Sequence, residues 1–300
     1  MLMYTHLILS GGGLTGMVYS GVIQYFQKNN IKFKHITGTS IGAFFGTIIA
    51  LGLESKDVDN LCNSVVNNKE LTTFNYKDIV FGFDNYGFFD SDRCIYVIKD
   101  IIKDLTFLDF AKKTGINLIL CATRIKTMKP IYFSVDNTPN VLVSDALRAS
   151  MAIPYVIKPV KIGDEYYIDG GLTENVAYNS IPQEEIKNAL VLHIKAKHEI
   201  DKNPMANKTT YFTSLLTSYY RHNTGYTYLD KFLPNYCLID DCPISFFPIK
   251  KEKNGFILNV SEECIKKSKK HGYNRIEKYI TIKRNTYNLN ITKMTSNLFV

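Results

Sequence analysis

Ser40 is the residue of this chain best placed to act as a nucleophile. It lies in the pentapeptide G-T-S-I-G of residues 38–42, after the short apolar stretch 33–37 and before a longer apolar run. A serine at a tight strand-to-helix turn exposes its hydroxyl, and flanking glycines are needed where a Cβ would collide with the neighbouring strand or helix. The pentapeptide is short enough to occur by chance, so the rest of the chain must decide whether the chemistry is acyl transfer.

A glycine loop near the N-terminus offers donors for a negatively charged oxygen. Gly11, Gly12 and Gly13 follow an apolar run and precede an amphipathic stretch. Three successive glycines leave backbone N–H groups able to converge on an oxyanion. A phosphate-binding loop would need a Lys after Gly16, and a Rossmann loop would need an acidic residue about 20 residues further on, where Thr37 stands instead. The oxyanion interpretation is therefore favoured.

A carboxylate is the third element of this pattern. Asp169 follows the strand-like stretch 165–168 and precedes Gly170 and Gly171. An Asp at a strand end followed by two glycines presents its carboxylate where another backbone can approach closely. The tripeptide alone is more often a hairpin turn. A catalytic role for Asp169 is favoured here because the tripeptide occurs together with the serine turn and the glycine loop.

Together these elements resemble the patatin-like phospholipases, whose pattern is a G-G-G-x-[KR]-G loop, a G-x-S-x-G elbow and a late D-G-[GA]. Segments 148–154 and 158–160 are similar to the A-S-x-A-x-P and P-V segments of the family, and Asn175 matches the Asn after its D-G-G. The resemblance covers roughly residues 4 to 195. Two positions depart from the pattern: Thr15 replaces the usual Lys or Arg, and Ala177 stands where Pro often occurs.

The resemblance implies a catalytic dyad in which Asp169 receives the proton of Ser40. Such a carboxylate must lie within hydrogen-bond reach of the serine, and partial desolvation must raise its pKa. The resemblance also implies an oxyanion hole and a nucleophile elbow, formed respectively by Gly11, Gly12 and Gly13 and by Gly38 and Gly42.

A histidine-assisted triad stays open as an alternative. In the chain order of α/β-hydrolases the histidine would follow the Asp, and the candidates are His193, His198, His222 and His271. His193 lies inside an apolar stretch and is predicted to be a strand residue. The other three lie in polar segments without a recognisable catalytic context.

Alternating strand and helix patterns predict an α/β fold. We expect three α/β/α layers around a mostly parallel sheet, with the ligand at the carboxyl ends of the strands. The predicted strands are 5–9, 33–38, 116–123, 131–135, 165–168 and 190–195, and the predicted helices are 15–28, 41–52, 55–68, 91–103, 144–151, 209–221 and 261–280. Residues 4–195 should form the catalytic domain. Residues 196–300 should pack on it as a core-covering extension or as a lid or interfacial surface, with poor order over 285–297.

The composition predicts a basic globular chain without a metal site. Its 45% hydrophobic content is ordinary, its longest apolar run is too short to cross a bilayer, and its first residues lack a signal-peptide pattern. Six scattered cysteines lack metal-ligand spacing and indicate reduced thiols in a cytoplasmic protein. No cofactor is expected, and calcium should be unnecessary.

The excess of positive charge indicates which partners the chain could bind. The chain has 36 Lys and Arg against 28 Asp and Glu, with lysines concentrated in 250–253 and 266–270. These segments are either solvated faces or a surface that adsorbs peripherally to anionic lipid. Nucleic-acid binding is not expected because no recognition motif accompanies the charge. The oligomeric state is not predicted.

The resemblance implies a lipid acyl hydrolase of the phospholipase A or lysophospholipase type. Its substrates would be phospholipids or related glycerolipids, cleaved through an acyl-serine intermediate. Two alternatives stay open: a transacylase that uses the same dyad, and a non-catalytic patatin-like protein that binds lipids or membranes.

Overall fold

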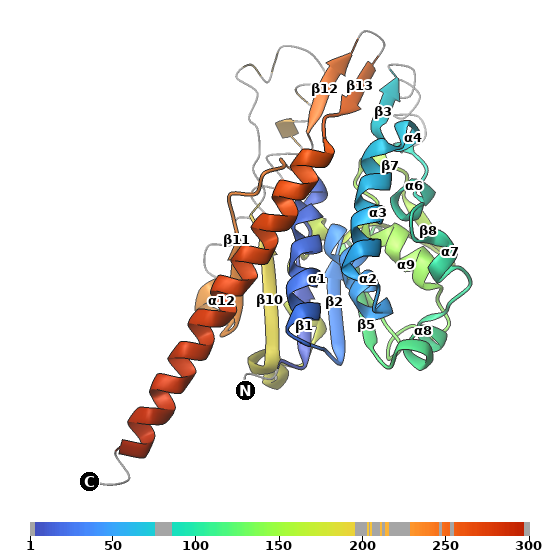
Figure 1. The fold of residues 1–300 in the computed structure, drawn as a ribbon. Helices are drawn as coiled ribbons and strands as arrows, with labels where there is room; N and C mark the ends of the chain where they lie inside the picture. Colours follow the sequence, from blue (N-terminus) through green and yellow to red (C-terminus); the bar gives the residue numbers. More distant parts are fainter. Residues whose placement is uncertain are drawn as a thin grey trace.

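An eight-stranded sheet forms the centre of the protein (Figure 1). The structure, a computed structural model, describes residues 4–75, 86–195, 203, 205, 211, 214–215, 229–245, 248–252 and 255–296. The strand order is β11-β10-β1-β2-β5-β9-β8, with β6 paired to β5. These strands are β1 (His6–Leu9), β2 (His35–Thr39), β5 (Asn117–Arg124), β6 (Lys129–Phe133), β8 (Val160–Ile162), β9 (Glu165–Asp169), β10 (Ala189–Ile194) and β11 (Tyr236–Ile239).

The sheet is mostly parallel, and both of its faces are covered. Strands β11, β10, β1, β2 and β5 run parallel, whereas β6 and β9 pair antiparallel with β5 and β8 pairs antiparallel with β9. Along β1, Leu7 and Leu9 pack in the larger hydrophobic core, while Ile8 between them packs in a second core on the opposite face. Burial on both faces explains why these strands appear as continuous apolar runs in the sequence. The predicted layered α/β fold is confirmed.

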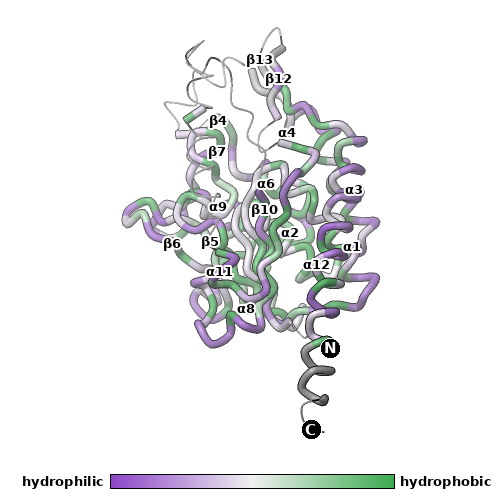
Figure 2. The backbone as a smooth tube through the Cα atoms, turned by 90° about the vertical axis from the view of Figure 1, so that its left-hand side faces the viewer, coloured by the Kyte–Doolittle hydropathy of each residue, from purple (hydrophilic) through white to green (hydrophobic). Residues whose placement is uncertain are grey.

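Helices connect the strands and cover the sheet. The α-helices are α1 (Tyr19–Lys28), α2 (Ile41–Leu51), α3 (Ser55–Asn67), α4 (Lys69–Thr72), α6 (Asp92–Ile95), α7 (Lys99–Ile102), α8 (Phe107–Thr114), α9 (Val143–Ser150), α11 (Leu229–Phe232) and α12 (Glu262–Ser296). The 3-10 helices in the described ranges are η1 (Gly13–Val18), η2 (Gly170–Leu172), η3 (Tyr178–Ser180) and η4 (Gln183–Asn188). Hydrophobic residues concentrate along the central strands and α2, and hydrophilic residues mark outer helices such as α3 (Figure 2).

Two small sheets flank the main one. The first contains β3 (Thr73–Asn75), β12 (Ile249–Glu252) and β13 (Gly255–Leu258), and the second pairs β4 (Gly87–Phe89) with β7 (Tyr155–Ile157). The first lies beyond the carboxyl ends of the parallel strands, at the top of Figure 1. A small hydrophobic cluster joins the two sheets, because Leu258 packs against the pair formed by Phe89 and Val156.

The long helix α12 crosses α1 at very close range, and the rest of it runs past the far end of the sheet (Figure 1). A Cβ at Gly21 of α1 would lie 1.8 Å from the carbonyl oxygen of Lys269, and one at Gly272 of α12 would lie 1.9 Å from that of Val18. Only glycine fits where two helix backbones approach so closely. The C-terminal segment is therefore attached to the first helix of the chain.

Several local expectations differ from the structure. The helix predicted over 91–103 is interrupted: α6 and α7 are separate short helices, and Ile95, Ile98 and Ile102 are all buried. The Asn-rich end predicted to be poorly ordered continues α12 as far as Ser296. The strand predicted to be last, β10, is followed at the sheet edge by β11. Most of the helix predicted over 209–221 lies outside the described residues.

Candidate active site

Ser40 occupies a strained turn between β2 and α2. Its backbone has φ 54° and ψ −123°, in a region that non-glycine residues rarely adopt. Holding a residue there costs on the order of 1–3 kcal/mol, which the surrounding structure must offset. The turn places the serine directly before the first turn of α2, at the carboxyl end of β2.

The glycines on either side of Ser40 are required by their surroundings. A Cβ at Gly38 would lie 2.4 Å from the carbonyl oxygen of Gly42, and a Cβ at Gly42 would lie 2.4 Å from the carbonyl oxygen of Leu9. All of these atoms belong to backbone, which cannot rotate away as a side chain could. The turn, the start of α2 and the end of β1 are therefore packed backbone to backbone around the serine.

The side chains of Ser40 and Asp169 are in direct contact. The Ser40 hydroxyl donates a hydrogen bond of 2.6 Å to Oδ2 of Asp169. Strand register brings the two residues to one level of the sheet, because Thr39 pairs with Cys121 of β5, and the next residue of β5, Ala122, pairs with Asp169. The backbone after Asp169 passes so near β5 that a Cβ at Gly170 would lie 2.3 Å from the Cys121 carbonyl oxygen.

The protein interior around Asp169 stabilises the protonated, neutral form of its carboxyl group relative to the same group in water. Its side chain is fully buried, and its pKa lies at about 7 instead of 3.8 because desolvation raises it more than the local hydrogen bonds lower it. Hydrogen bonds from the Ser40 hydroxyl and the Gly171 amide, the latter 2.7 Å from Oδ1, act in the opposite direction and lower the pKa. A carboxylate whose pKa is near neutrality, and whose oxygen lies 2.6 Å from a serine hydroxyl, can accept the proton of that serine.

Two polar side chains that the sequence did not single out hold this pair in place. Ser150, the last residue of α9, accepts a 2.9 Å hydrogen bond from the Ser40 amide and donates one of 2.6 Å to the Cys121 carbonyl. The Thr123 hydroxyl donates to the Asp169 carbonyl at 2.9 Å. Ser150 lies within segment 148–154, which the sequence marked as similar to the family. That similarity did not indicate the contact between Ser150 and the Ser40 amide.

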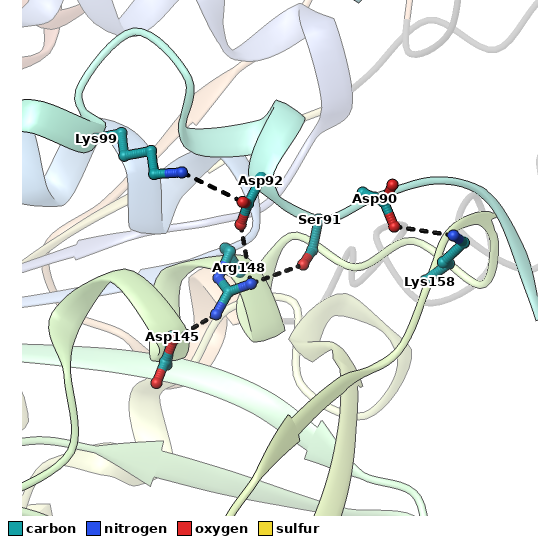
Figure 3. A network of polar contacts seen from close by, with 7 residues as sticks. All are labelled: Asp90, Ser91, Asp92, Lys99, Asp145, Arg148 and Lys158. Carbon is teal, nitrogen blue, oxygen red and sulfur yellow. Dashed lines mark hydrogen bonds and ion pairs between the residues drawn. The ribbon is translucent and has the colours of Figure 1, made fainter. Parts of the chain in front are cut away.

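An ionic cluster fixes the helix that carries Ser150. Arg148 on α9 lies between Asp145 of the same helix and Asp92 of α6, and it also approaches Ser91 (Figure 3). These groups are partly exposed, so each pair contributes little to stability by itself. These ion pairs instead hold α9 in position, because they join α6 to the helix whose last residue contacts the Ser40 amide.

The glycine loop lies beside Ser40, with unequal roles for its three amides. A Cβ at Gly11 would lie 3.1 Å from the Cβ of Ser40. The Gly11 N–H donates to the Asn175 carbonyl at 3.2 Å, whereas the Gly12 and Gly13 amides have no hydrogen-bond partner within the described part of the chain. Of the three predicted oxyanion donors, Gly12 and Gly13 are therefore the two still available to a ligand.

Thr15, which replaces the basic residue usual in the family, lies inside the protein. Its side chain is fully buried on η1, and its hydroxyl has no hydrogen-bond partner among the residues described. A cationic side chain is therefore lacking at this point of the loop.

The two histidine candidates within the described residues, His193 and His271, form hydrogen bonds with groups other than Ser40 and Asp169. The His193 ring is buried on β10 and hydrogen-bonds the Tyr236 hydroxyl of β11, and His271 contacts the Asp240 carbonyl at 2.7 Å. His198 and His222 lie outside the described residues. The described ranges also contain no group of three or more His, Cys, Asp or Glu side chains that could hold a metal ion. Cys62, Cys94, Cys121, Cys237 and Cys264 carry free thiols in the described structure.

The sequence matches a known family over all three motifs. The profile of the patatin-like phospholipase family covers residues 7–180. This match includes the glycine loop, the serine turn and Asp169, and it spans more than half of the chain. The chain belongs to the patatin-like phospholipase family.

Individual relatives are distant. The chain is 29% identical to an uncharacterized protein of Acanthamoeba polyphaga mimivirus over 181 residues, which are 57% of this chain and 59% of that protein. It is 25% identical to a probable lipid hydrolase of Invertebrate iridescent virus 6 over 248 residues, covering 80% and 79% of the two. The match to the mimivirus protein thus spans less than two thirds of that protein's length.

A solved structure supports the fold. VipD from Legionella pneumophila superposes with a TM-score of 0.55 at 17% identity, covering 93% of this chain and 67% of that one. At that identity the likeness concerns the fold alone.

Proposed function

We propose that this protein is a serine-dependent lipid acyl hydrolase that cleaves fatty-acyl esters of phospholipids or related glycerolipids. The observation that carries the proposal is the 2.6 Å hydrogen bond from the Ser40 hydroxyl to a fully buried Asp169, set beside the glycine loop. Family membership and similarity to a probable lipid hydrolase support a lipid ester as the substrate class.

In the proposed acylation step, the Asp169 carboxylate accepts the Ser40 proton as Oγ attacks the ester carbonyl. The Gly12 and Gly13 amides then donate to the oxyanion of the tetrahedral intermediate. Collapse of the intermediate expels the alcohol, which takes the proton from Asp169. The acyl group remains on Ser40, and the base is again ionised.

In the proposed deacylation step, Asp169 accepts a proton from the incoming nucleophile and returns it to Oγ of Ser40 as the acyl group leaves. With water the product is a free fatty acid, and with an alcohol it is a new ester, so the same residues serve a hydrolase or a transacylase. Mass spectrometry of products from mixed phospholipid vesicles distinguishes the two activities. The contact between Ser40 and Asp169 disfavours the other alternative, a non-catalytic lipid-binding protein, because such a protein would need neither the buried carboxylate nor the strained serine.

A fluorophosphonate is expected to label Ser40 covalently, because its phosphonyl oxygen resembles the oxyanion that the glycine amides would hold. The labelling rate should rise with pH through about 7, where Asp169 becomes ionised. A calcium chelator should leave the rate unchanged, because the proposed mechanism uses no metal. Peptide mapping identifies the labelled residue. Label on a different serine, or none on a folded and active preparation, would contradict the proposal.

We also propose that the protein acts as a peripheral enzyme at lipid surfaces. No helix in the described ranges is long and apolar enough to cross a membrane. Within the lysine-rich part of α12, Lys266 and Lys270 are exposed, Lys267 pairs with Glu263, and the partly buried Lys269 pairs with Asp59. Under this proposal residues 4–195 form the catalytic domain, and residues 196–300 contribute part of the lipid-facing surface.

Binding to anionic vesicles should weaken as salt rises through physiological strength. The physical reason is that the Debye length falls to about 8 Å and screens the attraction between lysines and lipid head groups. Co-sedimentation with vesicles at increasing salt measures the effect. Equal binding to neutral and anionic vesicles at low salt would rule out electrostatic docking.

A further inference from the structure

The segment that follows Asp169 contacts both the serine turn and the glycine loop. The Glu174 carbonyl accepts the Thr39 hydroxyl at 3.2 Å, directly before the nucleophile. The next carbonyl, that of Asn175, accepts the Gly11 amide at 3.2 Å. The chain directly after Asp169 therefore contacts both the serine turn and the start of the glycine loop.

The shape of this segment depends on a buried carboxylate. The Glu174 side chain accepts a short hydrogen bond from the Tyr132 hydroxyl of β6 through Oε2. Its Oε1 accepts the Asn179 backbone amide at 3.0 Å and the Asn179 side-chain amide at 2.9 Å. Glu174 is only 7% exposed, and no Lys or Arg forms an ion pair with it in the described structure.

A buried carboxylate without a cation is costly unless neutral donors surround it. Burial raises the pKa of Glu174, and hydrogen bonds from Tyr132 and Asn179 counter part of that rise. Those donors come from β6 and from a residue five positions further along the chain. The Glu174 carboxylate therefore connects both ends of the 174–179 turn to Tyr132 of β6. These bonds also hold the carbonyls of residues 174 and 175 in place.

We propose that Glu174 is a positioning residue for the reaction of Ser40: its carboxylate holds the turn whose carbonyls orient the serine turn and the glycine loop. This inference rests on the proposed function. Glu174 does not touch Ser40 or the proposed oxyanion donors. Its removal should therefore slow the chemical step through misalignment and leave lipid binding almost unchanged.

The test compares Glu174→Ala and Glu174→Gln with the wild type in ester hydrolysis and in the rate of fluorophosphonate labelling of Ser40. We expect Glu174→Ala to lower kcat by about 10- to 100-fold with KM within about threefold, since small displacements of reacting groups cost that much. Glu174→Gln should recover kcat to within about fivefold of wild type, because its amide oxygen still accepts both Asn179 donors. A purely structural role would lower the melting temperature without separating kcat from KM.

Glu165→Ala is the matched control. Glu165 lies at the other end of β9 from Asp169 and pairs at the surface with Lys126, so its variant should keep wild-type kcat. If Glu174→Ala does not fold, Tyr132→Phe replaces it, with an expected kcat loss of about three- to tenfold. Wild-type kcat and labelling rate in the folded variant would overturn the inference. Absence of Ser40 labelling in the wild type would instead overturn the proposed function.

Discussion

Ser40→Ala is expected to abolish ester hydrolysis. Oγ of Ser40 is the proposed atom that forms the acyl-enzyme, and removing the nucleophile of a serine hydrolase costs on the order of 10⁴- to 10⁶-fold in kcat. The fold should persist, because alanine keeps the Cβ and the Ser40 amide still donates to Ser150. Release of fatty acid from phospholipid vesicles measures the loss, and circular dichroism verifies the fold.

Ser64→Ala is the control for this experiment. Ser64 lies on the exposed side of α3, where its hydroxyl donates a hydrogen bond to the Asn60 carbonyl of the same helix. Its loss should leave turnover unchanged. Substantial turnover by a folded Ser40→Ala protein would show that the serine turn is not the site of acylation.

Asp169→Asn should also remove activity, by on the order of 10³-fold or more, because the amide cannot accept the serine proton. In the wild type, kcat/KM should rise with pH through about 7, as Asp169 loses its proton. The variant should lose that rise together with its activity. A histidine variant that lost activity while Asp169→Asn retained it would favour the triad alternative.

The same substitution is expected to stabilise the fold above neutral pH. The folded-state pKa of Asp169 is about 7 against an ordinary value of 3.8, so the folded chain retains a proton that the unfolded chain releases between these values. Stability therefore falls as pH rises from 3.8 to 7, and above 7 the buried charge imposes its full cost. Asparagine carries no charge, and we expect a gain of about 2–4 kcal/mol at pH 8 and almost none at pH 4.

Thermal unfolding at these two pH values tests the sign of the effect. Asp164→Asn, in the exposed turn before β9, is the control and should change the melting temperature little at either pH. If Asp169→Asn lowered stability at pH 8, the carboxylate would be stabilised by its surroundings, and the proposed cause of its raised pKa would be wrong.

Local sequence predicted most elements of the central sheet. The run 5–9, the stretch 33–38 and the stretch 190–195 correspond to β1, β2 and β10, with boundaries within two residues. Continuous apolar runs between turn residues are a strong signal for strands buried on both faces. Two strands of this sheet were missed, β8 with three residues and β11 with four. Strand β11 gains its partner from β10, so pairing rather than local pattern determines it.

Helix predictions failed where burial overrides the local pattern. Between α6 and α7, Ile98 is fully buried and its φ of −121° departs from helical geometry, so packing determines the chain path there. The end of α12 shows the opposite case. Its Asn-rich sequence suggested poor order, yet residues 285–296 continue a helix already held at Gly272 by its crossing with α1.

The sequence by itself determined the chemical groups and the turns that present them. The glycines around Ser40, the glycine loop and the Asp-Gly-Gly tripeptide are local requirements, because steric limits on each turn act over a few residues. Tertiary structure decided how these turns meet. Ser40 and Asp169 are 129 residues apart in the chain, and only the register of β2, β5 and β9 brings their side chains together.

Tertiary structure also determined the contacts that support Ser40 and Asp169. Ser150 at the Ser40 amide, Asn175 at the Gly11 amide and the Glu174 carboxylate at Tyr132 each join segments distant in sequence. Burial, which raises the pKa of Asp169 to about 7, also depends on every element packed around it. A motif specifies which groups are present, whereas their distances and desolvation arise only when the whole chain has folded around them.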